Sequence, residues 1–122
     1  VIALRSASKN KIVGNYIKKA KCGLSFQEKF SFIVKESEEN IIAKNEFCGA
    51  GIYIEKSHFN RFIQNHLPDL KNYAVYSHYS GNNSYSGNTI RNVGSMIEPY
   101  VKRGSLFFEK SRNDTLIRNS IS

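Results

Sequence analysis

FCGAGIYIEKSHFNRFIQNHLPDLKNYAVYSHYSG, residues 47–81, is the stretch on which the predicted fold depends. Residues 51–55 are rich in side chains that favour strands. Apolar residues at helical spacing come next, in a segment that Ser57 would cap and Pro68 would end. Alternation of side-chain character over residues 72–79 then predicts a half-buried strand. The stretch therefore predicts a strand–helix–strand unit.

The flanking segments extend this pattern in both directions. Apolar stripes at helical spacing predict a helix over residues 8–21 and one or two helices over residues 25–45. Short segments rich in β-branched and aromatic residues follow at 89–93, 105–109 and 115–118, with residues 111–114 as a hairpin loop. We predict an α+β fold in which N-terminal helices pack on a four- to five-stranded, mainly antiparallel sheet. No internal repeat is predicted, and we expect residues 1–122 to be a single domain cut from a longer chain.

The charge is strongly positive and unevenly distributed. Eighteen Lys and Arg residues against ten Asp and Glu residues give a net charge of +8, which attracts polyanions, nucleic acid first. Residues 1–21 carry six basic side chains and no acidic one, whereas residues 22–55 carry three Lys and six Glu. Two basic regions separated by an acidic one predict a functional face.

Several classes of chemistry find no support in the sequence. It has no GxxxxGK[ST] loop, no HExxH and no CxxC motif, so we expect neither a metal nor another cofactor. Cys22 and Cys48 are either paired or reduced, and the sequence does not decide between these states. No apolar run approaches the roughly 18–20 residues of a membrane span.

Metal-independent RNA cleavage needs only an acid, a base and cations, and the chain has candidates for each. We predict His78 as base or acid, with His58 or Glu109 as its complement, and Arg112 and Arg91 as stabilisers of transition-state charge. Phosphate contacts are predicted for Lys9, Lys11, Lys18, Lys19, Lys102 and Arg103, and base stacking for Tyr76 and Tyr79. The alternative for each histidine is a structural role.

A basic domain of this size, with N-terminal helices followed by an antiparallel sheet, resembles the C-terminal ribonuclease toxin domains of bacterial polymorphic toxins. The nearest comparison is with contact-dependent growth inhibition and colicin-like toxins. The resemblance implies an endoribonuclease acting on RNA, tRNA first. It also implies a cognate acidic immunity protein, delivery from a secreted parent protein and action in the cytoplasm of a target cell.

Two alternatives remain beside the ribonuclease. Residues 49–54 are similar to the glycine-containing strand that lines the NAD site of ADP-ribosyltransferases, although the other motifs of that family are missing. A non-enzymatic module that binds RNA or an acidic partner would also explain the charge.

Overall fold

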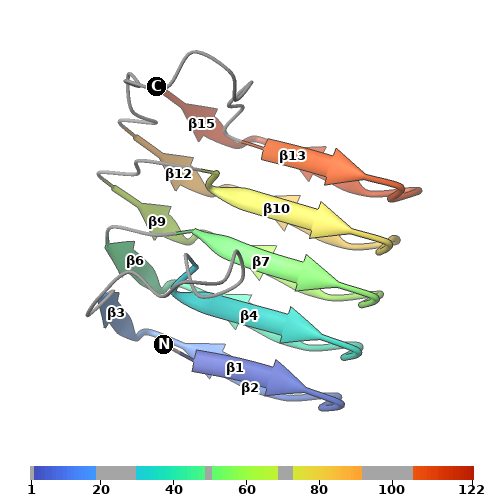
Figure 1. The fold of residues 1–122 in the computed structure, drawn as a ribbon. Coiled ribbons are helices and arrows are strands. Elements are labelled where there is room, and N and C mark those ends of the chain that lie inside the picture. Colours follow the sequence, from blue (N-terminus) through green and yellow to red (C-terminus); the bar gives the residue numbers. More distant parts are fainter. Residues whose placement is uncertain (1, 19–29, 49–50, 69–72, 92–105) are drawn as a thin grey trace.

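The computed structural model describes residues 2–18, 30–48, 51–68, 73–91 and 106–122, and every regular element in these ranges is a strand. The strands follow one another in groups of three, and each group makes one coil of a solenoid (Figure 1). Coils 1 and 2 comprise β1 (Ile2–Arg5), β2 (Lys11–Val13), β3 (Tyr16–Lys18), β4 (Phe32–Lys35), β5 (Ile41–Ala43) and β6 (Glu46–Cys48). Coils 3, 4 and 5 comprise β7 (Ile52–Glu55), β8 (Arg61–Ile63), β9 (His66–Leu67), β10 (Val75–His78), β11 (Ser84–Ser86), β12 (Thr89–Ile90), β13 (Leu106–Glu109), β14 (Thr115–Ile117) and β15 (Ser120–Ile121).

Equivalent strands of successive coils pair to form three parallel, five-stranded sheets. Sheet A has the order β1-β4-β7-β10-β13, sheet B has β14-β11-β8-β5-β2, and sheet C has β15-β12-β9-β6-β3. Figure 1 shows sheet A facing the viewer, with coil 1 at the bottom and coil 5 at the top. This arrangement is a parallel β-helix, so the predicted α+β fold with an antiparallel sheet is wrong.

The predicted helices are wrong because one coil produces an apolar spacing that resembles a helical stripe. Phe62 in β8 and Leu67 in β9 are both buried, but they enter the core from different sheets, on either side of a sharp turn. Ile17, which is buried, and Ile12, which is partly buried, likewise enter the core from β3 and β2. Of the predicted helix 25–45, residues 30–45 are described, and they contain β4 and β5.

Five of the predicted strands overlap strands of the structure, but their pairing is different. The segments 51–55, 72–79, 89–93, 105–109 and 115–118 overlap β7, β10, β12, β13 and β14. β10 pairs in parallel with both β7 and β13, at sequence separations that no hairpin can bridge. Residues 111–114 are therefore not a hairpin loop; they belong to the turn that carries coil 5 from sheet A to sheet B.

Each coil carries the pattern Ser-x2-Asn-x4-Asn, so the prediction of no internal repeat is wrong. The pattern begins at Ser37, Ser57 and Ser80; coil 1 has Ala7 in place of the serine, and coil 5 has Asp114 in place of the first asparagine. Equivalent residues are separated by 30, 20, 23 and 31 positions, because segments of different length join the coils. A repeat without a constant period escapes a search for one.

The asparagines form two ladders inside the turns. Asn60 is buried; its Oδ1 accepts from the backbone amide of Asn40 at 3.0 Å, and its Nδ2 donates to the Ser37 carbonyl at 3.0 Å. The second ladder repeats this geometry, with Asn65 accepting from the amide of Asn45 at 3.0 Å. The ladders satisfy buried backbone groups where the strands break, which lets the chain turn without leaving unpaired polar atoms.

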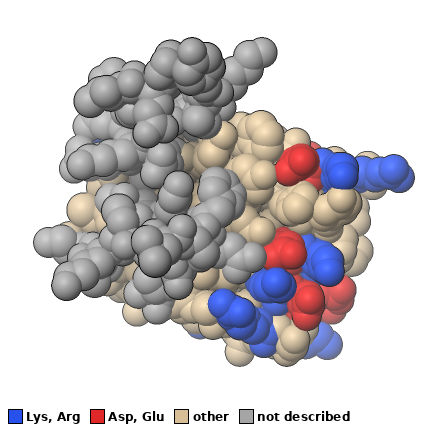
Figure 2. Space-filling view, in the orientation of Figure 1, with Lys and Arg blue, Asp and Glu red and all other residues tan. Residues whose placement is uncertain are grey.

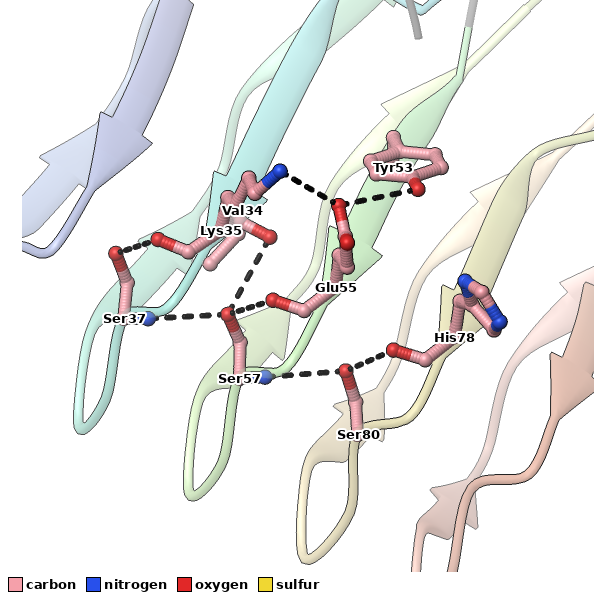
Figure 3. Close-up of polar contacts among 8 residues, drawn as sticks. All are labelled: Val34, Lys35, Ser37, Tyr53, Glu55, Ser57, His78 and Ser80. Carbon is pink, nitrogen blue, oxygen red and sulfur yellow. Dashed lines mark hydrogen bonds and ion pairs between the residues drawn. The ribbon is translucent and has the colours of Figure 1, made fainter. Parts of the chain in front are cut away.

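A serine column reinforces the turn that follows sheet A (Figure 3). The backbone amide of Ser37 donates to the hydroxyl of Ser57, and the amide of Ser57 donates to the hydroxyl of Ser80, both at 3.1 Å. The Ser57 hydroxyl itself donates to the carbonyl of Glu55 at 2.8 Å. Ser57 therefore belongs to the serine column and is not the predicted helix cap.

The core consists of the side chains that point inward from all three sheets. Phe32, Val34, Ile52 and Ile54 come from sheet A and are buried. In coil 4, the small Ser77 occupies the core position that Val34 and Ile54 hold in coils 2 and 3. Tyr85 of the same coil enters the core from sheet B and stacks on Phe62, with ring centroids 5.0 Å apart. Successive side chains of a strand point to opposite faces of the sheet. The side chains of sheet A that do not enter the core therefore point outward, and they form the candidate site.

Candidate functional site

The outer face of sheet A carries two columns of side chains that run along the solenoid. The first column consists of Ala3, Ile33, Tyr53, Tyr76 and Phe107. The second consists of Arg5, Lys35, Glu55, His78 and Glu109. In Figure 2, acidic and basic side chains gather together at the right, over the ends of the sheet A strands and the turns that follow them. The charged column therefore borders a partly aromatic one.

His78 and Glu109 meet in this second column because they are register partners on β10 and β13. The Nε2 atom of His78 lies 3.6 Å from the Oε2 atom of Glu109, and 26% and 41% of the two side chains are exposed. The hydroxyl of Tyr76 donates to the same oxygen at 2.8 Å. Burial and the neighbouring Glu109 carboxylate raise the pKa of Tyr76 to about 12, so the phenol keeps its proton at neutral pH.

A similar arrangement lies beside it on the preceding coils (Figure 3). The Lys35 ammonium lies 3.2 Å from Glu55 Oε2, and the Tyr53 hydroxyl donates to the same oxygen at 3.3 Å. Each glutamate of the column thus has a tyrosine donor and a nitrogen base beside it. Beside Glu55 the nitrogen is the Lys35 ammonium, a cation at neutral pH, whereas beside Glu109 it is the His78 imidazole, which can also donate a lone pair.

Tyr79 stands next to His78 at the start of the turn. Its ring centroid lies 4.2 Å from that of His78, and its hydroxyl accepts from the Lys110 ammonium at 2.6 Å. This hydrogen bond raises the pKa of Lys110. The ring covers one side of the imidazole, while the Tyr79 side chain itself is 45% exposed, so it is a wall of the site that a ligand can reach.

The structure separates the other predicted catalytic residues from this pair. His58 and Arg112 lie in one column of the turns after sheet A, with Gly81 bridging them. No hydrogen bond or ion pair within the described ranges joins either of them to His78 or Glu109. Arg91 directly follows β12 in sheet C, so two turns and the strand β11 separate it from His78 within coil 4. They do not form one catalytic group with the pair.

The predicted phosphate-binding residues do not form one surface. Lys9 lies in the turn after sheet A, whereas Lys11 lies in β2 of sheet B. Lys18 ends β3, and its side chain is not among those described. Lys19, Lys102 and Arg103 lie outside the described residues.

The described parts of the chain contain no complete metal site. No group of three or more His, Cys, Asp or Glu side chains is close enough there to hold one ion. The His78–Glu109 pair offers one imidazole nitrogen and one carboxylate oxygen, which are donors that Cu(II) accepts. Cys22 and Met96, two soft ligands, lie outside the described residues. The described donors therefore provide two ligands and leave the remaining coordination positions open.

A comparison with protein families identifies the chain. The family described as periplasmic copper-binding protein (NosD) matches residues 2–122. The chain belongs to this NosD family. No curated protein matches, and no solved structure matches.

Family membership corrects several predictions. The match is to a periplasmic copper-binding family and not to a toxin, so the resemblance to contact-dependent growth inhibition toxins and the ribonuclease function are wrong. Nothing supports the ADP-ribosyltransferase alternative, and the family's periplasmic location conflicts with action in the cytoplasm of a target cell. Enzymatic activity and the partners, RNA and an acidic immunity protein, are not tested by these findings and stay predictions. Within the described residues, no helix is long and apolar enough to cross a membrane.

Some residues of the face were not predicted at all. Lys35, Tyr53 and Glu55 form the second carboxylate cluster, and the sequence places them in two coils without an obvious motif. The signal that would have found them is the Ser-x2-Asn-x4-Asn pattern, because aligning its copies brings Lys35, Glu55 and His78 to the same position.

Proposed function

We propose that the chain binds copper in the periplasm as a passing cargo, and that His78 and Glu109 form the docking point. One observation carries this proposal: the partly exposed side chains of His78 and Glu109 approach to 3.6 Å, between Nε2 and Oε2, in a chain that belongs to a copper-binding family. A small displacement of either side chain would let both donate to one ion.

The geometry suits exchange of the ion better than its retention. Two protein ligands leave positions for water or for a ligand from another protein, and both side chains are partly exposed. A buried, closed set of ligands would instead hold the metal permanently. Tyr76 orients the carboxylate through its hydrogen bond to Oε2, which reduces the freedom that Glu109 must lose on binding.

Calorimetric titration with Cu(II), repeated with Zn(II), tests the proposal. We expect binding that is tighter for Cu(II), because a site of nitrogen and oxygen donors follows the Irving–Williams order. His78→Ala and Glu109→Gln should each weaken binding by about tenfold or more, because each variant removes one of the two ligands.

His66→Ala provides the matched control. His66 is also half-buried, lies on the outer face of sheet C and has a glutamate, Glu46, as register partner, but no ion pair within the described residues joins them. The variant should keep the affinity of the unsubstituted protein. Equal losses in His78→Ala and His66→Ala, or no Cu(II) binding at all, would contradict the proposal.

A further inference from the structure

The outer face of sheet B, with the turns that join it to sheet C, carries only positive charge. Its residues are 11–14, 41–44, 61–64, 84–87 and 115–118, all of which the structure describes, and none is Asp or Glu. Lys11, Lys44, Arg61 and Arg118 all lie on it and are exposed. The described acidic residues lie elsewhere, mainly on sheet A and the turns after it. We call this surface the cationic face.

The cations on this face follow the repeat of the solenoid. Lys11, Lys44, Arg61 and Arg118 come from coils 1, 2, 3 and 5, so each of these coils contributes one. Lys11 and Arg61 share one column of sheet B, whereas Lys44 and Arg118 share a second column three residues further along, so the charges form a double row along the solenoid axis. A row of this kind complements an extended polymer with a regularly repeated negative charge.

Coil 4 contributes a hollow instead of a cation. Along the outward column Val13–Ala43–Ile63–Ser86–Ile117, a serine replaces an aliphatic side chain in coil 4. The next residue is Gly87, at φ +62°, where Gln64 and Arg118 stand in the adjacent coils. These small residues leave a hollow of about 230 Å³, lined by Ile63, Gln64, Ser86, Gly87, Ile117 and Arg118.

We propose that the cationic face binds an acidic polysaccharide, with one sugar unit in this hollow. Ile63 and Ile117 are apolar walls for the C–H faces of a sugar ring. Ser86 and Gln64 can exchange hydrogen bonds with its hydroxyl groups. The Arg118 guanidinium matches a carboxylate in a bidentate fashion.

Other polyanions fit the face less well. The outward residues of sheet B include no aromatic ring on which an unpaired base could stack. They also include no Trp, Phe or Leu, the side chains that a protein inserts into a bilayer surface. The short aliphatic side chains and the hollow instead suit a polymer that lies along the sheet.

Polygalacturonate is the probe, and its fully methyl-esterified form is the control because it keeps the sugar backbone without the charge. We expect the complete chain to bind the acid in a salt-sensitive manner and to bind the ester at least about tenfold more weakly, since charged hydrogen bonds are worth that much. Equal binding of both polymers, or binding of neither, would overturn the proposal. Binding of vesicles of phosphatidylglycerol or of single-stranded DNA in preference to the polymer would also overturn it.

Two matched pairs of variants locate the site. Arg118→Gln should weaken binding about tenfold, whereas Arg112→Gln, the same change in the same coil on the turn after sheet A, should not. Ser86→Val fills the hollow that holds the sugar ring and should weaken binding of the acid, whereas Ser84→Val, which points outward from the same strand but does not line the hollow, should not. Equal effects within either pair would overturn the proposal. The arginine pair keeps the test valid even where a core-adjacent valine disturbs folding, and neither pair touches His78 or Glu109.

Discussion

His78 Nε2 lies 3.6 Å from Glu109 Oε2, although 31 residues separate the two in the sequence. The two strands that hold them are in register, so the residue that closes β10 stands directly beside the residue that closes β13. Parallel coiling thus builds the pair from two equivalent positions of a repeat. The same register places Glu55 on the other side of His78.

Tyr76→Phe tests the role of the phenol beside this pair. Removing the hydroxyl takes away the donor that orients Glu109, so we expect Cu(II) affinity to fall a few-fold without loss of the site. Calorimetric titration measures this change. An unchanged affinity would show that the carboxylate needs no such orientation.

The same variant should alter the stability at alkaline pH. The pKa of Tyr76 in the folded protein, about 12, is above the value of 10.0 for a free tyrosine. The folded protein therefore keeps a proton that the unfolded chain loses, and its free energy of unfolding should fall as the pH rises from 10 towards 12. Urea unfolding at several pH values should show a smaller fall for Tyr76→Phe than for the unsubstituted protein, and equal falls would contradict the assignment.

Asn60→Ala should destabilise the protein by about 3 kcal/mol, because it leaves buried partners without hydrogen bonds. The side chain of Asn60 bonds both to Asn40 and to the Ser37 carbonyl inside the ladder. Asn10→Ala, at the end of the same ladder, should cost about 1 kcal/mol, since Asn10 is only half-buried and no described residue donates to its Oδ1. Urea unfolding measures both, and similar costs at the two positions would argue against the ladder as a source of stability.

Asp114→Asn should stabilise the protein at neutral pH. Asp114 takes the ladder position that asparagine holds in the other coils, so it lacks the Nδ2 donor that Asn83 directs to the Ser57 carbonyl. An asparagine would regain one hydrogen bond, worth about 1 kcal/mol. Thermal unfolding at pH 7 measures the gain, and a loss of stability would show that the carboxylate is needed at this position.

The gain should also depend on pH. Burial raises the pKa of Asp114 above its usual 3.8, against the opposing effect of the hydrogen bonds from Asn83 and of His58. The folded state therefore favours the protonated carboxyl, and stability should fall as the pH rises from about 4 through the raised pKa. Asp114→Asn removes this fall, so the difference between the two proteins should shrink when the unfolding is repeated near pH 3.5.

Glu39→Gly should stabilise the protein modestly. Glu39 is exposed and adopts φ 55°, a left-handed conformation that costs a side-chain-bearing residue about 1 kcal/mol or more. Glycine removes this strain but loses more entropy on folding, so we expect a net gain of up to about 0.5 kcal/mol. Glu39→Ala keeps the strain and should give no gain in urea unfolding; an equal gain from alanine would point to the lost charge instead.

The sequence predicts β7, β10 and β13 of sheet A, whereas β4 lies in a segment predicted as helix and the assembly of the strands could not be predicted. The alternation of Val75, Tyr76, Ser77 and His78 is local information, and it correctly predicts β10. Asn60 and Asn65 were assigned to a helix because Phe62 and the apolar residues around it have helical spacing, although two asparagines in this segment already favour turns. The turns at Glu39 and Gln64 use non-glycine residues at positive φ, so no glycine marks where the chain reverses.

Two residues of the candidate site, His78 and Glu109, could be predicted from the acid–base chemistry of their side chains. His78 and Glu109 were selected as an acid–base pair from their residue types, and their proximity depends on a register that no local pattern encodes. His58 was selected on the same grounds, but its position in the coil takes it to the turn after sheet A. Lys44, Arg61 and Arg118 were not selected, because their shared face becomes visible only when the coils are aligned.

Electron paramagnetic resonance of the Cu(II)-loaded protein decides whether His78 ligates the ion. We predict hyperfine coupling to one imidazole nitrogen in the unsubstituted protein and in His66→Ala, and loss of this coupling in His78→Ala. Coupling that survives His78→Ala, or a spectrum with several imidazole nitrogens, would contradict a copper site built on His78 and Glu109.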